Sequence, residues 1–394
     1  MRNSFLSFFK TKQNLYTKLI IFLFLIVNSS FNFGGCEDCC EQYFGCNFGS
    51  KKEEEENVKK NQNIFGNIQG EPIDINNSEN FNTLSVVFGI ILGNDLNPTE
   101  NVNIENIQEE EKFDQFKVSI EDFTFCVKLL KGNYEEIKEN HISNNALNQE
   151  TANLYTLREK PNFLNFYGSY IFQNRVFICI DYCDGGDLKT FIDNLSLAEI
   201  NSELYKSFSR QLFNILQILR ENKITHRDIK LENFFVIKNN NNPEIVLGDF
   251  SLSQYGGNEE DGNLKCIKRF SYCLDFFYKS PIYRQFFLDL ISHKAEKIDS
   301  YNAYNEDLFA VALILYYLKN EKKYPTFIGE VLNLEKMNQQ NLLNQTIQDF
   351  NNYFNSDDYK NHENELYNKI FLKFKDKNDN DTIEINEFIN ELNP

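Results

Sequence analysis

Positive charge is scarce in this sequence relative to its length. The 394 residues carry 40 Lys and Arg against 58 Asp and Glu, which gives a formal net charge of −18 at pH 7. Nucleic-acid-binding chains usually present a basic face, so this balance argues against a nucleic-acid partner. Long apolar runs are missing near the N-terminus, where Leu19–Val27 has nine apolar residues and a membrane-spanning helix needs about 20.

The first 50 residues combine a basic head, this short apolar run and a cluster of cysteines. Such a plan is typical of a secretory signal or a membrane anchor, and a buried helix or a removable leader are the alternatives. The cysteines lack the paired Cys-x-x-Cys spacing of a zinc site. Membrane association through residues 1–50 is therefore one expectation, and a cytoplasmic location is the alternative. The clustered cysteines are Cys36, Cys39, Cys40 and Cys46.

Residues 51–83 are rich in charge and asparagine, with four consecutive glutamates at 53–56. Such a composition cannot bury enough apolar surface to fold by itself, so it predicts a solvated linker. The apolar fraction of the whole chain is 41%, with 38 Phe, which is enough for a large core. We expect the globular domain to occupy residues 84–394.

The stretch Ile224–Ile237, with the letters ITHRDIKLENFFVI, holds the most chemically useful side chains at close spacing. The Asp228 carboxylate can accept a proton from an attacking hydroxyl, and Lys230 can neutralise a transferring phosphoryl group. The amide oxygen of Asn233 can hold a divalent cation. These three residue types at this spacing point to phosphoryl transfer.

This stretch resembles the catalytic loop of the protein-kinase superfamily, His-Arg-Asp-x-x-x-x-Asn. The resemblance implies a two-lobed α+β fold, with a β-rich N-lobe containing one helix over 84–182 and a mainly helical C-lobe over 183–394. It also implies ATP and Mg²⁺ as cofactors and a protein as substrate. Lys230, two residues after Asp228, resembles the Ser/Thr-specific members.

The resemblance assigns further residues to the nucleotide. Phe123–Lys128 reads as a strand whose final lysine, Lys128, would pair the α- and β-phosphates. A helical pattern follows, and Glu150 is the expected partner of that lysine. Glu135, Glu136 and Glu139 remain alternatives to Glu150.

The segment after the strand Val176–Ile180 resembles the hinge between the two lobes. Backbone groups of Asp181 and Cys183 would meet the adenine edge, and Asp187 would meet the ribose hydroxyls. Paired glycines at 185 and 186 would let the chain turn into the next helix. The apolar residues over Ser202–Glu221 recur near helical spacing and predict a core helix.

Glu244–Leu247 reads as a short strand before Gly-Asp-Phe-Ser, which resembles Asp-Phe-Gly with serine at its last position. Asp249 would then bind Mg²⁺ together with Asn233. The segment that follows carries Ser271, Tyr272 and Tyr278 as candidate phosphorylation sites. Asp307 matches the aspartate that braces the catalytic loop from the central C-lobe helix.

Besides Ser251, the sequence departs from the family in two further places. No glycine occurs between Gly93 and Gly132, so the glycine-rich phosphate loop is missing, and residues 94–112 read as an acidic insert after a first strand at 84–92. Ile282 replaces a glutamate that pairs with a buried arginine in the family, and no arginine occurs near Asn380. Losing both partners of a buried ion pair can be neutral, whereas losing one costs about 3–5 kcal/mol.

The expected function is that of an ATP-dependent protein Ser/Thr kinase. A catalytically impaired pseudokinase that serves as a binding module is the alternative, because the glycine loop is absent. A third class is a calcium sensor, since six residues near the C-terminus fit an EF-hand loop that lacks its glycine. Those residues are Asp376, Asn378, Asn380, Thr382, Glu384 and Glu387. The same part of the chain also reads as two final helices of the domain, Leu366–Phe374 and Ile385–Leu392, joined by a loop.

Overall fold

The computed structural model describes residues 65–68, 102–109, 113–120, 123–172, 174–239, 242–255, 263–264, 278–281, 283–284, 301–328, 339–376 and 382–392. These residues belong to two compact units. The sheet unit consists of Met1–Asn144 and Phe166–Tyr182, and the helical unit consists of Asn145–Asn165 and Cys183–Pro394. The leader at 1–50 and the expected first strand at 84–92 lie outside the described residues.

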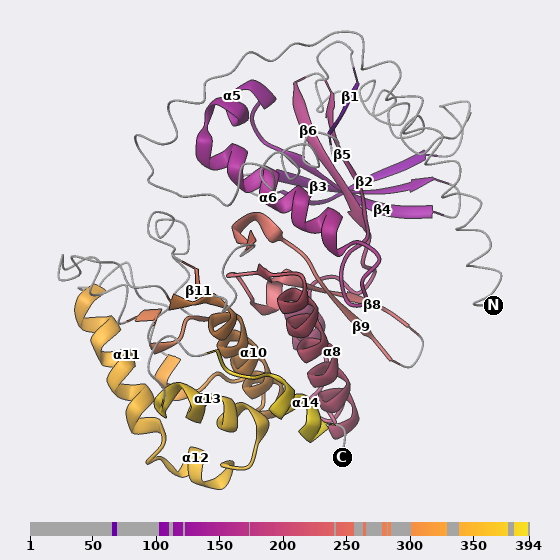
Figure 1. Ribbon diagram of the computed structural model, residues 1–394. Coiled ribbons are helices and arrows are strands. Elements are labelled where there is room, and N and C mark those ends of the chain that lie inside the picture. Colours follow the sequence, from indigo (N-terminus) through magenta and orange to yellow (C-terminus); the bar gives the residue numbers. More distant parts are fainter. Residues whose placement is uncertain are drawn as a thin grey trace, which may run out of the picture. The chain divides into compact units, whose positions relative to one another are not determined.

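The sheet unit is built on one six-stranded sheet with the order β1-β5-β6-β4-β3-β2 (Figure 1). All neighbouring strands pair antiparallel except β1 and β5, which run parallel. The described strands are β1 (Phe65–Ile68), β2 (Val102–Glu109), β3 (Phe113–Ile120), β4 (Phe123–Leu130), β5 (Phe166–Phe172) and β6 (Arg175–Asp181). The predicted strands at 123–128 and 176–180 are confirmed as β4 and β6.

Strand β2 differs from the sequence-based expectation of an acidic insert over 94–112. It pairs along its length with β3, from Val102 opposite Ile120 to Glu109 opposite Asp114. A bulge between Asn106 and Gln108 shifts the register, so the apolar residues do not alternate regularly along the strand. The hairpin therefore exists, and three residues without glycine (Glu110, Glu111 and Lys112) connect its strands.

Strand β1 comes from the segment that the composition predicts to be a linker, and its sequence gives no strong strand signal.

The helices of this part of the chain are α5 (Tyr134–Glu139) and α6 (His141–Leu157). Asn133 caps α5, and its side chain and that of Glu136 form a reciprocal capping box. Within the described ranges, no helix combines the length and the apolar character that crossing a bilayer requires.

The helical unit is organised around α8 and α10. The predicted helix over Ser202–Glu221 is confirmed as α8, which begins after the side-chain cap Asn201. Helix α10 is buried on all sides from Leu308 to Leu318, as expected of a central core helix. The described helices are α7 (Leu188–Asn194), α8 (Ser202–Glu221), α10 (Ala303–Lys319), α11 (Gln339–Tyr353), α12 (Asp357–Asn361), α13 (Leu366–Asp376) and α14 (Asn386–Leu392).

The segments between the helices of this unit contain short strands and single 3₁₀ turns. The catalytic stretch begins with β7 and ends with β8, and the two-stranded ladders β7–β10 and β8–β9 hold these two ends. These elements are β7 (Ile224–Thr225), η1 (Leu231–Asn233), β8 (Phe234–Ile237), β9 (Glu244–Leu247), η2 (Phe250–Leu252), β10 (Gln254–Tyr255), β11 (Asn263–Leu264), β12 (Tyr301–Asn302) and η5 (Thr326–Ile328).

Aromatic side chains fill the core between α10, α11 and α13. Phe309 of α10 lies 5.4 Å from Phe371 of α13, and Phe327 lies 5.0 Å from Phe350 of α11, measured between ring centroids. The first pair is tilted and the second is edge-to-face, and favourable aromatic pairs add about 0.5–1.5 kcal/mol each beyond the buried area. Many of the phenylalanine side chains therefore pack in the core of the helical unit.

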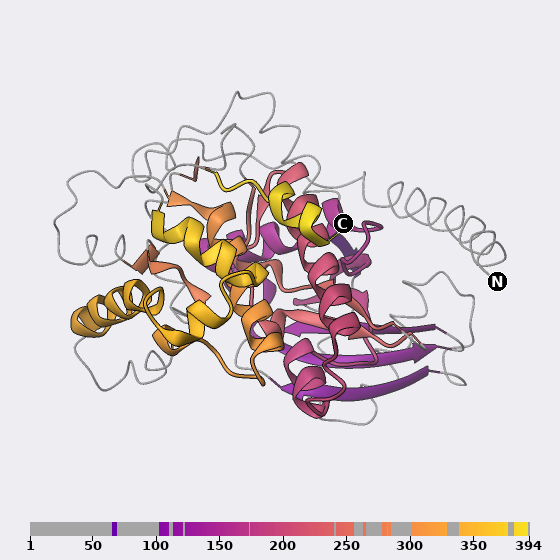
Figure 2. The same cartoon turned by 90° about the horizontal axis from the view of Figure 1, so that it is seen from below.

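The C-terminal segment closes this unit as the predicted final helices. Figure 2 shows the last helix, α14, beside α8, and the ring of Phe388 stacks on that of Phe213 at 6.0 Å. Arg220 donates to the carbonyl of Ile383 at 2.8 Å. Two of the six EF-hand positions are engaged elsewhere, because Thr382 accepts a hydrogen bond from Asn302 and Glu387 pairs with Lys373. Residues 377–381 lie outside the described residues.

The paired glycines before α7 have different physical roles. The N–H of Gly185 donates to the carbonyl of Val236 at 2.8 Å, and a Cβ on Gly185 would lie 2.6 Å from that oxygen. Gly186 has a φ of +70° but nothing within 4 Å of a Cβ. Close approach therefore requires glycine at 185, and backbone conformation favours it at 186.

Alanine at these two positions should separate steric overlap from backbone strain. Gly185→Ala should lower the free energy of unfolding by about 2–3 kcal/mol, because Val236 must move. Gly186→Ala should lower it by about 1 kcal/mol, the cost of a left-handed L-residue. Chemical unfolding of both variants measures the difference, and equal losses would contradict this account.

Candidate active site

The catalytic stretch is held by a carboxylate from the central helix. Both oxygens of Asp307, in the first turns of α10, accept backbone hydrogen bonds, from the N–H of His226 at 2.7 Å and of Arg227 at 2.8 Å. Burial raises the pKa of Asp307, and these two hydrogen bonds oppose that rise. The predicted brace between Asp307 and the catalytic loop is confirmed.

Arg227 needs this support because it has a φ of +69°. A bulky residue rarely adopts this left-handed conformation, which costs about 1–3 kcal/mol and persists only where the surrounding structure enforces it. Its carbonyl accepts a hydrogen bond from the buried ammonium of Lys279, and its guanidinium donates to Gln254 at 3.3 Å. The strained residue immediately before Asp228 is thus fixed on its N–H, its carbonyl and its side chain.

His226 links the catalytic loop to the Asp-Phe-Ser segment. Its Nδ1 lies 3.3 Å from the N–H of Asp228, and its Nε2 lies 2.9 Å from the carbonyl of Gly248. With Nδ1 as the acceptor, the proton sits on Nε2, which donates to Gly248. The His226 ring also contacts that of Phe250 edge-on at 4.9 Å.

Asp228, Lys230 and Asn233 come together as the sequence predicts. Lys230 Nζ lies 3.0 Å from Asp228 Oδ2, and Asn233 Nδ2 donates to the same oxygen at 2.9 Å and to the Asp228 carbonyl at 2.7 Å. Among the described residues, Asp228 Oδ1 and Asn233 Oδ1 take no hydrogen bond. The Asp228 side chain is 12% exposed. One carboxylate oxygen is therefore positioned by its partners, and the other is left for an incoming group.

Backbone hydrogen bonds connect the segment that carries Asp249 to the segment that carries Asn233. Gly248 donates its N–H to the Asn233 carbonyl at 3.0 Å, and β8 and β9 pair Phe234 with Leu247. Asp249 has a φ of +52°, and its Oδ1 accepts from the Ser251 hydroxyl at 2.8 Å. Serine in place of glycine thus adds a hydrogen bond to the carboxylate without removing it from the site.

The donor set of Asp249 and Asn233 fits a hard cation such as Mg²⁺. Carboxylate and amide oxygens are the ligands that Mg²⁺ prefers, and it commonly completes its shell with phosphate oxygens and water. Within the described ranges, no three His, Cys, Asp or Glu side chains gather into a ready-made metal cage.

Lys128 lies on β4 of the sheet unit and is 6% exposed. Its Nζ sits 4.4 Å from the centroid of the Phe113 ring, a cation–π contact. Glu150 is buried on α6 in the part of that helix that belongs to the helical unit. The two residues belong to different units, and their pairing stays a prediction.

The hinge residues occupy the ends of both units. Asp181 ends β6, where its carboxylate accepts from the Tyr167 hydroxyl at 2.5 Å. Cys183 is buried, and its carbonyl accepts from the Gly186 N–H at 3.1 Å. Contacts of their backbone groups with adenine stay a prediction.

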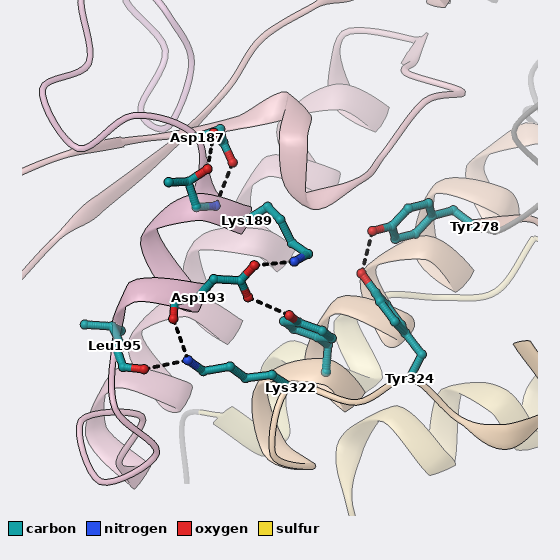
Figure 3. Close-up of polar contacts among 9 residues, drawn as sticks. Asp187, Lys189, Asp193, Leu195, Tyr278, Lys322 and Tyr324 are labelled. Carbon is teal, nitrogen blue, oxygen red and sulfur yellow. Dashed lines mark hydrogen bonds and ion pairs between the residues drawn. The ribbon is translucent and has the colours of Figure 1, made fainter. Parts of the chain in front are cut away.

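Asp187 has a structural role that the sequence analysis did not anticipate. Its carboxylate caps α7 by accepting from the N–H and the hydroxyl of Thr190, each at 2.8 Å (Figure 3). Helix α7 is also held at its other end, where Lys322 donates to the carbonyls of Asp193 and Leu195. A ribose contact by Asp187 stays a prediction. Such a contact would use the carboxylate lone pairs that do not accept hydrogen bonds from Thr190.

Tyr278 is not exposed as a phosphorylation site must be. It is buried, and its hydroxyl lies 2.6 Å from that of Tyr324 (Figure 3). Burial raises the pKa of Tyr278 well above its ordinary value. In this conformation the hydroxyl is packed against another chain segment, so the structure does not support this candidate. Ser271 and Tyr272 lie outside the described residues.

A buried charged cluster that no sequence pattern predicted lies next to the catalytic loop, and we call it the Glu306 cluster. It consists of Lys279, Ser280, Arg284 and Glu306, all buried. Ser280 donates to Glu306 through its N–H at 3.0 Å and its hydroxyl at 2.6 Å. Burial lowers the pKa of Arg284 to about 10 and raises that of Glu306. No local sequence pattern indicates this cluster, because Ser280 and Glu306 are 26 positions apart in the chain.

Comparison with known proteins agrees with this geometry. The family model described as a protein kinase domain matches residues 117–378, which is about two thirds of the chain. The serine/threonine-protein kinase ATG1a of Arabidopsis thaliana is 32% identical over 96 residues, 24% of this chain and 15% of that protein. The serine/threonine-protein kinase Nek5 of Homo sapiens is 33% identical over 107 residues, 27% of this chain and 15% of that protein.

The mitosis inhibitor protein kinase mik1 of Schizosaccharomyces pombe is 29% identical over 133 residues, which cover 33% of this chain and 21% of that protein. The matched stretches thus span less than a quarter of each of these three relatives. The family match, however, extends over both the β-sheet N-lobe and the helical C-lobe, and it includes the whole catalytic stretch. This chain therefore belongs to the protein kinase domain family.

Proposed function

We propose that this protein is an active, ATP-dependent Ser/Thr kinase that phosphorylates hydroxyl groups of protein substrates. One observation carries the proposal: Asp228, Lys230 and Asn233 form a bonded trio in which a carboxylate oxygen of Asp228 is left for a substrate hydroxyl. A general base must lie within hydrogen-bonding reach of the proton that it accepts. The backbone brace from Asp307 supplies the rigidity that such a base requires.

In the proposed mechanism, Asp228 orients the substrate hydroxyl and accepts its proton during transfer. The Lys230 ammonium, at 3.0 Å from Asp228 Oδ2, stabilises negative charge on the transferred group. Asn233 holds the Asp228 carboxylate with its amide nitrogen, and its amide oxygen would be available to hold the nucleotide's metal. The chain thereby provides positioning and electrostatic stabilisation, which dominate phosphoryl transfer.

Mg-ATP, when bound, supplies the phosphoryl group and the cation that neutralises its developing charge. Asp249 and Asn233 would hold the cation, Lys128 supported by Glu150 would orient the phosphates, and backbone groups of Asp181 and Cys183 would meet adenine. Asp187 would meet the ribose. These assignments are carried by the family match and by the donor types of the side chains.

A second candidate function is a pseudokinase that binds partners without transferring phosphate. The sequence between β2 and β3 favours it, because residues 110–112 include two glutamates and no glycine. Acidic residues repel phosphate, and a connection without glycine lacks the residue type that allows the closest approach of backbone to phosphate. Retention of Asp228, Lys230, Asn233 and Asp249 supports activity.

A nucleotide-binding and transfer assay on the full chain separates the two functions. We expect Mg-ATP to raise the melting temperature and the protein to transfer labelled phosphate to a generic basic protein, with both effects lost on chelation of the metal. Asp249→Asn should weaken the metal-dependent part of nucleotide binding at least tenfold and abolish transfer. A nucleotide-induced shift without any transfer by the wild type would support the pseudokinase instead.

A further inference from the structure

The peptide group that joins Arg227 to Asp228 is fixed by a residue from outside the catalytic loop. Lys279 lies 52 residues further along the chain, and its Nζ donates to the Arg227 carbonyl. The lysine is only 5% exposed. A lysine is almost never buried to this extent unless it is paired or hydrogen-bonded, so its position calls for a physical reason.

The segment that carries Lys279 is itself anchored to α10. Both carboxylate oxygens of Glu306 accept hydrogen bonds from Ser280, the next residue after Lys279. The adjacent residue on α10, Asp307, holds the N–H groups of His226 and Arg227. Two neighbouring carboxylates therefore hold two different segments, and Lys279 connects those segments to each other.

The geometry has a direct consequence for the catalytic base. A peptide group is planar, so hydrogen bonds to the Arg227 carbonyl and from the Asp228 N–H together fix the orientation of the peptide plane between these residues. That orientation helps to set the direction in which the Asp228 side chain points. Arg227 is in a left-handed conformation, so a loop without this support has other, less strained conformations available. A displacement of about 1 Å at a reacting group can cost about 100-fold in rate.

We propose that Lys279 is a positioning residue for phosphoryl transfer: its ammonium, held in place by the Glu306 anchor, fixes the Arg227–Asp228 peptide and thereby orients the Asp228 carboxylate. The segment that carries Lys279 thus acts on the catalytic base through one hydrogen bond. The effect on rate rests on the proposed kinase activity, whereas the effect on the loop's conformation does not.

A simpler explanation is that Lys279 only balances the negative charge of Glu306 and Asp307. A double variant separates the two explanations. Lys279→Met with Glu306→Gln removes one positive and one negative charge, so the buried cluster keeps its charge balance, and the introduced amide can still exchange hydrogen bonds with Ser280. The hydrogen bond to the Arg227 carbonyl is lost. Glu306→Gln alone is the matched reference.

The test measures melting temperature, steady-state kinetics and amide hydrogen exchange on full-length variants. We expect the double variant to regain much of the melting temperature lost in Lys279→Met, yet to show a kcat at least tenfold below that of Glu306→Gln. Its KM for ATP should stay within about twofold. Exchange should accelerate at residues 226–229 and stay unchanged in α8. Lys323→Met, at a 72% exposed side chain, controls for loss of a lysine.

Recovery of kcat in the double variant would overturn the proposal, since charge balance would then explain the role of Lys279. Faster exchange throughout the helical unit would overturn it too, by showing a general structural role. Failure of the proposed function looks different: the wild type itself would transfer no phosphate. Hydrogen exchange then decides alone, and equal protection of residues 226–229 in the double variant and in Glu306→Gln would reject the positioning role.

Discussion

Asp228→Asn should reduce the rate of phosphoryl transfer about 10³-fold while leaving Mg-ATP binding nearly unchanged. Asparagine has the shape of aspartate and can still accept the hydrogen bond that Asn233 donates to Asp228 Oδ2. It cannot accept a proton, however, and general base catalysis typically contributes 10²–10⁴-fold. The loss should therefore be seen in kcat, with the KM for ATP changed by less than about threefold.

The measurement is transfer of labelled phosphate to a basic protein, together with the nucleotide-induced shift in melting temperature. Asp357→Asn is a matched control, because that side chain is 95% exposed on α12, and it should leave transfer at the wild-type rate. A variant at Asp228 that retains more than a tenth of the wild-type kcat would refute the assignment of Asp228 as the base. It would leave the family membership of the chain intact.

Asp307→Asn should destabilise the helical unit and abolish transfer. Both Asp307 oxygens accept backbone N–H groups, and an amide offers one oxygen and one NH₂ group, so one buried N–H of the catalytic loop would face another donor. Leaving a buried donor unsatisfied costs about 1–3 kcal/mol, and more next to a charged group. We expect the free energy of unfolding to fall by about 3 kcal/mol.

Chemical unfolding followed by far-UV circular dichroism measures this loss. Glu387→Gln provides the comparison, because the exposed pair of Glu387 with Lys373 should contribute less than about 1 kcal/mol. At temperatures below the melting temperature of Asp307→Asn, where the variant is still folded, its rate of phosphoryl transfer should already be lost, because the catalytic loop lacks the hydrogen bonds from Asp307. A fully active Asp307→Asn protein would show that the brace is dispensable.

Local patterns explain why several elements were predicted from the sequence. The helix over Ser202–Glu221 has a side-chain cap at Asn201 and apolar residues at helical spacing, and the structure has it between the same residues. Strands β4, β6 and β9 also lie where their apolar character indicated. Each of these signals depends on residues that are close together in the chain, so no tertiary information is needed to recognise them.

Strand β2 shows where such reasoning stops. Its residues are mostly polar, and the bulge between Asn106 and Gln108 interrupts the alternation of apolar side chains. Only pairing with β3 reveals the strand, and the segment was therefore interpreted as an acidic insert. Tyr278 is a similar case, because its burial against Tyr324 depends on a residue 46 positions further along the chain.

The amino-acid sequence alone determined which chemistry this protein has available: a carboxylate, an ammonium and an amide in one loop, and a second carboxylate after a short strand. These groups were predictable because their spacing along the chain is itself the signal. Tertiary structure decided which buried charge meets which backbone group. Lys279 lies 52 residues from Arg227, and Asp307 lies 80 from it, and contacts over such separations arise only when the α10 core brings the segments together.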